Sequence, residues 1–195
     1  MDKRFDLYLH ELIAWNNKFN LTAITKPEDI RLKHFADSLA LLKVFPLTDE
    51  RVLDIGSGAG FPGLPLKLAC PGIRLTLLEA TRKKTEFLKH LVTLLQLKNV
   101  EVVWGRSEEY QKIKKNSFDV VVARAVAKLD KLAGWALPLV TPGGHFIAYK
   151  EEQVEAEAAQ AAAAIAAQRG RLQSIEKVRL DDSEIVRSLV IIAKT

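Results

Sequence analysis

Five short apolar runs alternate with helix-forming segments through the middle of this chain of 195 residues. The runs cover residues 52–55, 75–78, 100–103, 119–123 and 145–149, and helical periodicity covers 64–69, 82–97, 108–113 and 129–139. Strands and helices that alternate in this way form a parallel sheet covered by helices. Two further runs, 171–179 and 189–194, predict last strands joined by the acidic turn 181–183. The pattern therefore predicts an α/β fold of the Rossmann-like type with a mostly parallel seven-stranded sheet.

The segments outside this core predict helices. Apolar residues recur at near-helical spacing over 2–19, and Pro27 begins a second helix that we expect to reach about residue 44. The Ala-, Glu- and Gln-rich stretch 151–169 favours a helix that ends at Gly170. We expect a single domain over 1–195, in which 1–45 form an N-terminal helical extension and 51–195 form the Rossmann-like core.

Several classes of protein are disfavoured by the composition. No apolar run approaches the roughly 20 residues that cross a bilayer, and the N-terminus lacks the apolar stretch of a signal peptide. The one cysteine, Cys70, excludes an internal disulfide and a cysteine-built metal site, and the four histidines lack metal-ligand spacing. We therefore expect a cytoplasmic monomer that binds neither a membrane nor a metal.

The net charge of +5 is unevenly distributed along the chain. Residues 51–130 carry 14 Lys and Arg against 8 Asp and Glu, whereas 1–50 carry 7 against 8 and 131–195 carry 8 against 8. A local basic excess attracts phosphate groups and favours a nucleic-acid partner over a neutral metabolite. A solvated basic surface explains the same excess equally well.

A glycine-rich segment follows the first apolar run. Gly56, Gly58 and Gly60 lack Cβ atoms, so the backbone can turn tightly and a ligand can lie against it. The spacing of Gly58, Gly60 and Gly63 also fits the dinucleotide-binding pattern, which is weak evidence on its own.

Three residues around this segment favour S-adenosylmethionine over a dinucleotide. Asp54 precedes the first glycine by two residues, where its carboxylate would lie near the cationic methionine end of that cofactor. Pro62 and Pro65 crowd the start of the next helix, where a pyrophosphate would need free N–H donors.

The end of the second run and the loops after the third and fourth runs should face the same crevice, because α/β sheets bind ligands at the carboxyl ends of their strands. Glu79 ends the second run, where its carboxylate can accept hydrogen bonds from both ribose hydroxyls; the alternative is a surface glutamate. Ser107 and Glu108 follow the third run, where they can meet the adenine, although Ser107 could also cap the next helix.

Arg124 leaves the fourth run as a permanently charged group, which requires a carboxylate or phosphate partner. We interpret it as the catalytic residue that positions substrate and cofactor, with a structural ion pair as the alternative.

Methyl transfer depends mainly on holding the nucleophile in line with the methyl group. Methylation of exocyclic amines usually relies on an Asp/Asn-Pro-Pro-aromatic sequence, which the loop 124–127 lacks. Methylation of carbon 5 of a pyrimidine needs a cysteine nucleophile, and Cys70 lies away from the expected crevice. N7 of guanine has a free lone pair and needs no general base, so it fits better than most acceptors.

The motifs together resemble one known family. They are Asn20-Leu21-Thr22, His34-Phe35-Ala36-Asp37-Ser38-Leu39, the segment 54–63 ending in Gly60-Phe61-Pro62-Gly63, Arg124-Ala125 and Arg187-Ser188-Leu189-Val190. These look like the RsmG family, also called glucose-inhibited division protein B, over nearly the whole chain. The resemblance implies a class I methyltransferase fold and methylation of N7 of one guanine in 16S ribosomal RNA.

The resemblance also suggests roles for single residues. It implies cofactor contacts for Gly56, Phe61, Ser107, Glu108 and Arg124. On the RNA side, the matching positions are Lys83, Lys84, Arg106, Arg187, Asn20 and His34, although His34 could equally be a structural histidine. Glu79 stands where many relatives have Asp and keeps the carboxylate. Two alternatives stay open: a methyltransferase that acts on another RNA or a small molecule, and a nicotinamide oxidoreductase.

Overall fold

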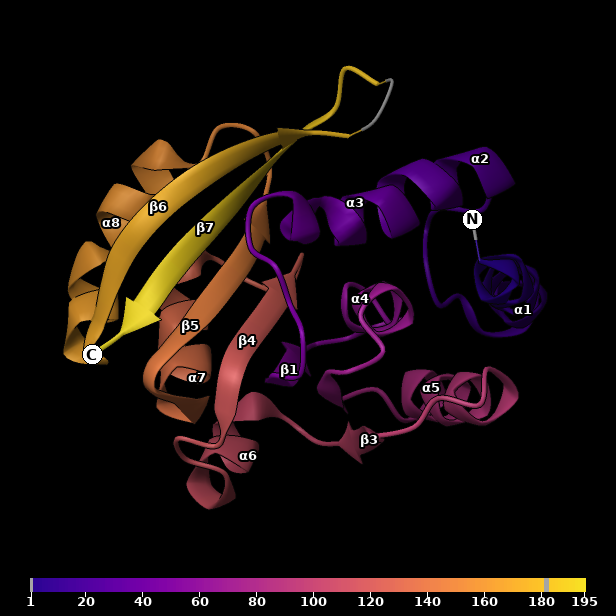
Figure 1. The fold of residues 1–195 in the computed structure, drawn as a ribbon, viewed down its shortest axis with the longest axis horizontal. Coiled ribbons are helices and arrows are strands. Elements are labelled where there is room, and N and C mark those ends of the chain that lie inside the picture. The colour runs from indigo at the N-terminus through magenta and orange to yellow at the C-terminus, as the bar shows by residue number, and fades with distance from the viewer. Residues whose placement is uncertain (1, 181–182) are drawn as a thin grey trace.

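The computed structural model describes residues 2–180 and 183–195 (Figure 1). Its strands are β1 (Arg51–Ile55), β2 (Arg74–Glu79), β3 (Val100–Trp104), β4 (Phe118–Arg124), β5 (Val140–Lys150), β6 (Gly170–Arg179) and β7 (Val186–Lys194). Its longer helices are α1 (Lys3–Phe19), α4 (Gly63–Ala69), α5 (Arg82–Leu94), α6 (Ser107–Ile113), α7 (Leu129–Ala136) and α8 (Glu155–Ala167). None of the helices in these described ranges is long and apolar enough to span a membrane.

The seven strands form one sheet in the order β3-β2-β1-β4-β5-β7-β6. Neighbours from β3 to β5 pair in parallel, and β7 runs antiparallel to both β5 and β6. This topology confirms the expected mostly parallel α/β sheet of the Rossmann-like type. The acidic turn expected at 181–183 includes residues 181 and 182, which lie outside the described residues.

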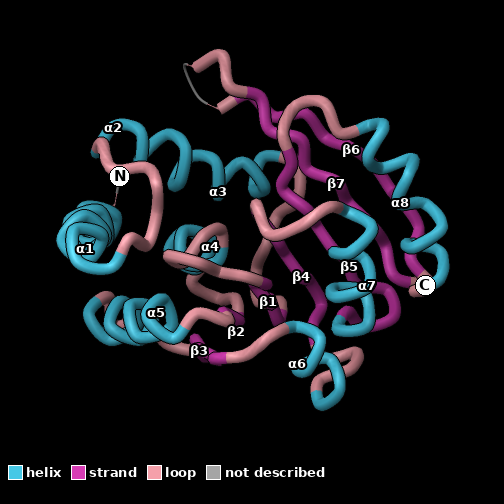
Figure 2. The backbone as a smooth tube through the Cα atoms, turned by 180° about the vertical axis from the view of Figure 1, so that it is seen from behind, coloured by secondary structure: helices cyan, strands magenta, loops and turns pink. Residues whose placement is uncertain are grey.

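Helices cover both faces of the sheet (Figure 2). The hydrophobic cluster on one face joins α1, α4 and α5 to strand residues such as Val52 and Leu75. The cluster on the other face joins α6, α7 and α8 to residues such as Leu53 and Val121. Adjacent residues of one strand therefore enter opposite cores, which explains why the central strands read as continuous apolar runs.

The N-terminal extension packs over the α4 side of the sheet. After α1, four short helical segments follow each other without a break: α2 (Pro27–Ile30), η1 (Arg31–Ala36), α3 (Asp37–Leu39) and η2 (Ala40–Lys43). Together they form the expected helix from Pro27 to about residue 44. The segment η1 is a π-helical turn, a feature that is frequent at functional sites.

Some predicted boundaries are wrong. The strand β5 begins at Val140, ahead of the expected 145, because it pairs early with Phe118 across a register shift. The helix α8 begins at Glu155 and ends before Gly170, which is the first residue of β6 and does not cap the helix. A Cβ atom at Gly170 would lie 2.7 Å from Leu137 Cδ1, so glycine allows the chain to pack closely against Leu137 there.

Candidate functional site

The glycine loop joins β1 to α4 at the carboxyl edge of the sheet. Gly56, Gly58 and Gly60 have φ angles of +67°, +58° and +105°, a region that favours glycine. A Cβ atom at Gly56 would lie 2.7 Å from Val126 Cγ2, and one at Gly60 would lie 2.6 Å from Leu64 Cδ1. The loop therefore requires these glycines for its own shape.

Asp54 lies fully buried beneath this loop. Its Oδ2 atom accepts a hydrogen bond from the Gly63 amide at 2.9 Å, whereas Oδ1 has no hydrogen-bond partner among the described residues. Burial raises the pKa of Asp54 to about 7, against the opposing effect of the Gly63 N–H. The unpartnered oxygen fits an acceptor for a cationic or N–H group of a cofactor on the loop.

The raised pKa of Asp54 predicts a pH dependence of stability. The folded state keeps this proton up to about pH 7, whereas the unfolded state loses it near the ordinary value of 3.8. The folded state therefore binds more protons between these values, so this group lowers stability as pH rises from about 4 to 7. The loss is on the order of 1.4 kcal/mol for each unit of pKa difference. Urea unfolding at a series of pH values gives the free energy of unfolding of wild type and of Asp54→Asn. The difference between the two proteins should change as pH rises from about 4 to 7, and a constant difference would contradict the assignment.

Glu79 ties the end of β2 to the glycine loop. Its buried carboxylate accepts hydrogen bonds from the Gly58 amide at 2.8 Å and from the Thr81 amide at 2.7 Å, one on each oxygen. Each carboxylate oxygen can accept a further hydrogen bond. The structure thus brings the predicted acid and the predicted loop together, with acceptor capacity left for two hydroxyl groups.

A cavity of about 160 Å³ lies beside the loop and is lined by several predicted residues, among them Gly56, Arg106, Ser107 and Glu108. Ser107 is buried, and its hydroxyl contacts Glu108 Oε2 at 3.3 Å. The N-cap of α6 is Arg106 without a side-chain hydrogen bond, so the alternative in which Ser107 caps this helix is wrong. Ser107 instead forms part of the cavity wall, where an adenine ring would be expected.

Arg124 lies in a buried ionic cluster with residues from both ends of the chain. Its Nη1 atom donates to Asp37 Oδ2 at 2.6 Å and to the Lys33 carbonyl at 3.0 Å. Arg187 Nε donates to the other oxygen of the fully buried Asp37 at 2.5 Å. Asp37 is thus the carboxylate that Arg124 requires. The sequence motif contained Asp37, but its local spacing does not indicate which distant arginines it would meet.

His34 completes this cluster as a neutral side chain. Its Nδ1 atom lies 2.9 Å from Arg124 Nη2, and its Nε2 atom lies 2.9 Å from Thr22 Oγ1. Because the guanidinium can only donate, Nδ1 is the acceptor and the proton is on Nε2. Burial and the charge of Arg124 lower the pKa of His34 to about 3. A histidine in this state is a poor general base.

Phe61 is enclosed by aromatic and cationic neighbours. Its ring stacks on His34, with centroids 4.4 Å apart, and on Tyr8, with centroids 5.3 Å apart. The guanidinium of Arg124 lies 5.2 Å from the ring centroid. The Phe61 ring therefore supports the cluster, and its backbone is the part that can meet a ligand on the loop.

A second cavity of about 430 Å³ opens beside the ionic cluster, lined by His34, Asp37, Arg124, Arg187 and Lys150 among others. Three predicted RNA-side residues lie elsewhere: Lys83 and Lys84 in the first turn of α5, and Asn20 at the end of α1. The predicted RNA-side residues are therefore spread over four places: the ionic cluster, the loop cavity, the start of α5 and the end of α1.

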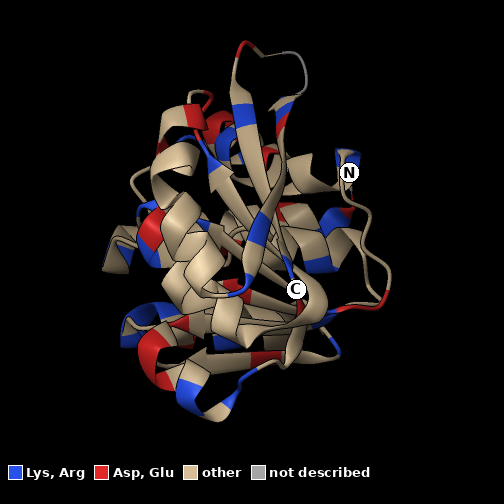
Figure 3. Cartoon of the chain, turned by 90° about the vertical axis from the view of Figure 1, so that its left-hand side faces the viewer, with Lys and Arg blue, Asp and Glu red and all other residues tan. Residues whose placement is uncertain are grey.

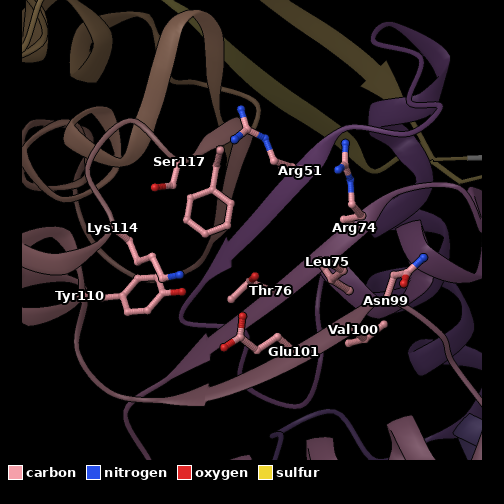
Figure 4. A pocket seen from close by; sticks show the side chains of 11 residues that line it. Arg51, Arg74, Leu75, Thr76, Asn99, Val100, Glu101, Tyr110, Lys114 and Ser117 are labelled. Carbon is pink, nitrogen blue, oxygen red and sulfur yellow. The ribbon is translucent and has the colours of Figure 1, made fainter.

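A further cavity of about 420 Å³ lies at the opposite, amino edge of the strands (Figure 4). It is lined by residues at the starts of four strands, including Arg51, Arg74, Val100 and Phe118, and by Tyr110 and Lys114 of the α6 region. None of the predicted site residues is among those that line it. Within the described ranges, no group of three or more His, Cys, Asp or Glu side chains could hold a metal ion.

Known proteins resemble this chain along nearly its whole length. Residues 1–186 match the GidB family model, described as rRNA small subunit methyltransferase G. The chain is 43% identical to Ribosomal RNA small subunit methyltransferase G of Caldanaerobacter subterraneus subsp. tengcongensis, over 98% of this chain and 81% of that protein. It is 41% identical to the protein of the same name from Lachnoclostridium phytofermentans, with the same coverage.

Solved structures with the same fold are more distant in sequence. A SAM dependent methyltransferase from Aquifex aeolicus superimposes with a TM-score of 0.63 at 17% identity, over 84% of this chain and 92% of that chain. TYW2 of M. jannaschii in complex with AdoMet gives 0.59 at 18% identity, over 74% and 68% of the two chains. These structures share the architecture of the sheet and its helices.

Proposed function

The chain belongs to the GidB family, rRNA small subunit methyltransferase G, and on this basis we propose that it methylates N7 of one guanine of 16S ribosomal RNA. The guanine would be guanosine 527 in the family's RNA numbering. The methyl donor is S-adenosylmethionine. One observation supports the position of the donor most strongly: the carboxylate of Glu79 is bonded to the Gly58 amide and keeps acceptor capacity at the loop.

The residues of the loop fit this cofactor. Glu79 would accept the ribose hydroxyls, and the cavity wall with Ser107 and Glu108 would hold the adenine. Asp54 receives the Gly63 amide on one oxygen and has no described partner on the other, which suits the cationic methionine end. When bound, the cofactor supplies a methyl group on a positively charged sulfur, which is open to attack by a lone pair.

The ionic cluster suits an acceptor that has no proton to lose. His34 is neutral, and its free lone pair is already occupied by Arg124, so it does not remove a proton. Described contacts use three of the five N–H groups of Arg124. The others can donate to an RNA phosphate or to O6 of guanine, and would hold N7 in line with the methyl group.

Loss of Arg124 should impair methylation far more than cofactor binding. We expect Arg124→Ala to lower the methylation rate about 100-fold, because misplacing a reactant by about 1 Å costs that much. The affinity for S-adenosylhomocysteine should fall by much less than the rate, because Glu79 and the glycine loop still hold the cofactor although Arg124 is one of its expected contacts. Arg51→Ala, which breaks an ion pair with Asp119 at the opposite edge, is the control. Wild-type methylation by Arg124→Ala would show that the crevice has been misplaced.

The function itself is tested with labelled S-adenosylmethionine and 16S ribosomal RNA, free or in small subunits. N7-methylguanine renders the RNA cleavable by aniline after borohydride reduction, so the modified position can be mapped. We expect one cleavage site in RNA treated with the enzyme and none in untreated RNA. Transfer of the labelled methyl group to another atom of the guanine, to another RNA or to a small molecule would contradict the proposal. Binding of NAD in place of S-adenosylhomocysteine would contradict it as well.

We also propose that the protein acts in the cytoplasm as a metal-free monomer. Residues 1–195 would work as one domain, because the N-terminal extension 1–45 contributes His34 and Asp37 to the cluster around Arg124. The extension would thus complete the acceptor side of the site, and the core 51–195 would supply the cofactor side.

A further inference from the structure

Two exposed aromatic rings lie near the start of α5, each with a cation beside it. Trp104 is 62% exposed and Phe19 is 40% exposed. The guanidinium of Arg82 lies 5.8 Å from the Trp104 ring centroid, and the ammonium of Lys83 lies 5.7 Å from the Phe19 ring centroid. The cations are consecutive residues at the start of α5, and their rings come from β3 and α1. The elements α1, α5 and β3 lie at one end of the molecule in both backbone views (Figures 1 and 2).

The Trp104 ring is held in place while it remains exposed. Trp104 is the last residue of β3 and pairs in register with Glu79 of β2. Its indole N–H donates to the Ala80 carbonyl at 2.9 Å, which fixes the polar edge of the ring. A fixed, exposed ring of this size is well suited to stack on a nucleobase, because every base presents a flat π-face.

Further basic residues lie close in sequence to these rings and their cations. Lys84 follows the two paired cations, the first turn of α5 contains no acidic residue, and the exposed Arg106 follows Trp104 by two residues. On the α8 and β6 side of the molecule, by contrast, Lys and Arg are interspersed with Asp and Glu (Figure 3). Cations interleaved with exposed rings suit single-stranded nucleic acid, which offers phosphates and bases together.

We propose that Trp104, Phe19, Arg82 and Lys83 form a stacking platform for unpaired nucleotides that flank the methylated guanine in the RNA substrate. This inference rests on the proposed function. The platform adjoins Glu79, at the ribose end of the cofactor site, whereas Arg124 lies in the ionic cluster. The platform therefore anchors flanking RNA and takes no part in methyl transfer. Its loss raises the Kd and KM for RNA and leaves kcat at saturating RNA unchanged.

The test compares three single variants in binding to 16S ribosomal RNA. Trp104→Ala should raise the Kd about tenfold to a hundredfold, the range found when one base loses its aromatic partner. Trp104→Phe keeps a ring and should recover most of the affinity. Ile113→Ala removes another exposed apolar side chain, 76% exposed at the end of α6, and should bind like wild type.

Salt dependence separates stacking from charge. Trp104→Ala should keep the wild-type slope of log Kd against log salt concentration, whereas Lys83→Ala should lower that slope by about one. Affinity for S-adenosylhomocysteine should be the same in every variant. Wild-type Kd and KM in Trp104→Ala, or equal losses in the Phe and Ala variants, would overturn the platform. Absence of RNA methylation by the wild type would instead overturn the proposed function, so the two failures are distinguishable.

Discussion

Replacing Asp37 with alanine is expected to destabilise the folded protein by about 3–5 kcal/mol, the usual cost of removing one partner from a buried ion pair. Asp37 is fully buried and receives hydrogen bonds from both Arg124 and Arg187. Without the carboxylate, two guanidinium groups that are mostly buried would face each other with no opposite charge. Urea unfolding at neutral pH measures the loss directly.

A matched control lies in the same N-terminal extension. Asp29 forms an ion pair with Lys33, whose side chain is 45% exposed, and the Asp29 side chain is itself 34% exposed. Exposed pairs contribute little, so Asp29→Ala should leave the unfolding midpoint almost unchanged. If Asp37→Ala behaved like Asp29→Ala, the cluster around Arg124 would not have the burial and pairing described here.

Replacing Glu79 with alanine is expected to raise the Kd for S-adenosylhomocysteine at least about 100-fold. Two hydrogen bonds to a charged acceptor contribute about 1.5–3 kcal/mol each, and both ribose hydroxyls would lose theirs. The Gly58 amide would also lose its acceptor, which loosens the loop that supports the ligand. Isothermal titration calorimetry gives the Kd, and thermal unfolding verifies that the variant is folded.

Glu101 provides the control for Glu79. It lies on the neighbouring strand β3, is exposed, and lines the cavity at the opposite edge of the sheet (Figure 4). We expect Glu101→Ala to bind S-adenosylhomocysteine like wild type. If Glu101→Ala lost affinity and Glu79→Ala kept it, the cofactor site would have to be reassigned to the amino edge.

The cofactor side of the site was predictable because its parts are close in sequence or follow from strand order. A glycine loop after a first strand and an acid after the second are joined by the geometry of adjacent parallel strands. The hydrogen bond between Glu79 and the Gly58 amide is the direct consequence. The alternation of apolar runs and helical segments also predicts a mostly parallel seven-stranded sheet, whereas the order of its strands comes from the structure alone.

The ionic cluster could not be assembled from local spacing. Asp37 meets Arg124 and Arg187 across separations of 87 and 150 residues, and a pairing pattern of this length has no periodic signal. A charged Arg124 at the end of an apolar run indicates an anionic partner, but the identity of that partner depends on how the N-terminal extension packs against the core. The same reason explains why the predicted RNA-side residues lie in four separate places.

Gly170 shows a different limit. A glycine after an alanine-rich helix predicts a C-cap, since glycine is the usual residue there. In the fold its role is tertiary, because Leu137 and Ile165 pack closely around that position. Local propensity predicts the end of this helix to within a few residues. The role of the glycine that follows it depends on tertiary packing, which local propensity does not describe.

The claim that the cofactor lies on the loop between β1 and α4 is tested most directly by a crystal structure with S-adenosylhomocysteine. We expect the ribose hydroxyls on the Glu79 carboxylate, the adenine beside Ser107, and the methionine end above Asp54. An adenosyl group in the cavity between Arg51 and Phe118, or a loop that is filled by the protein's own side chains, would contradict the account.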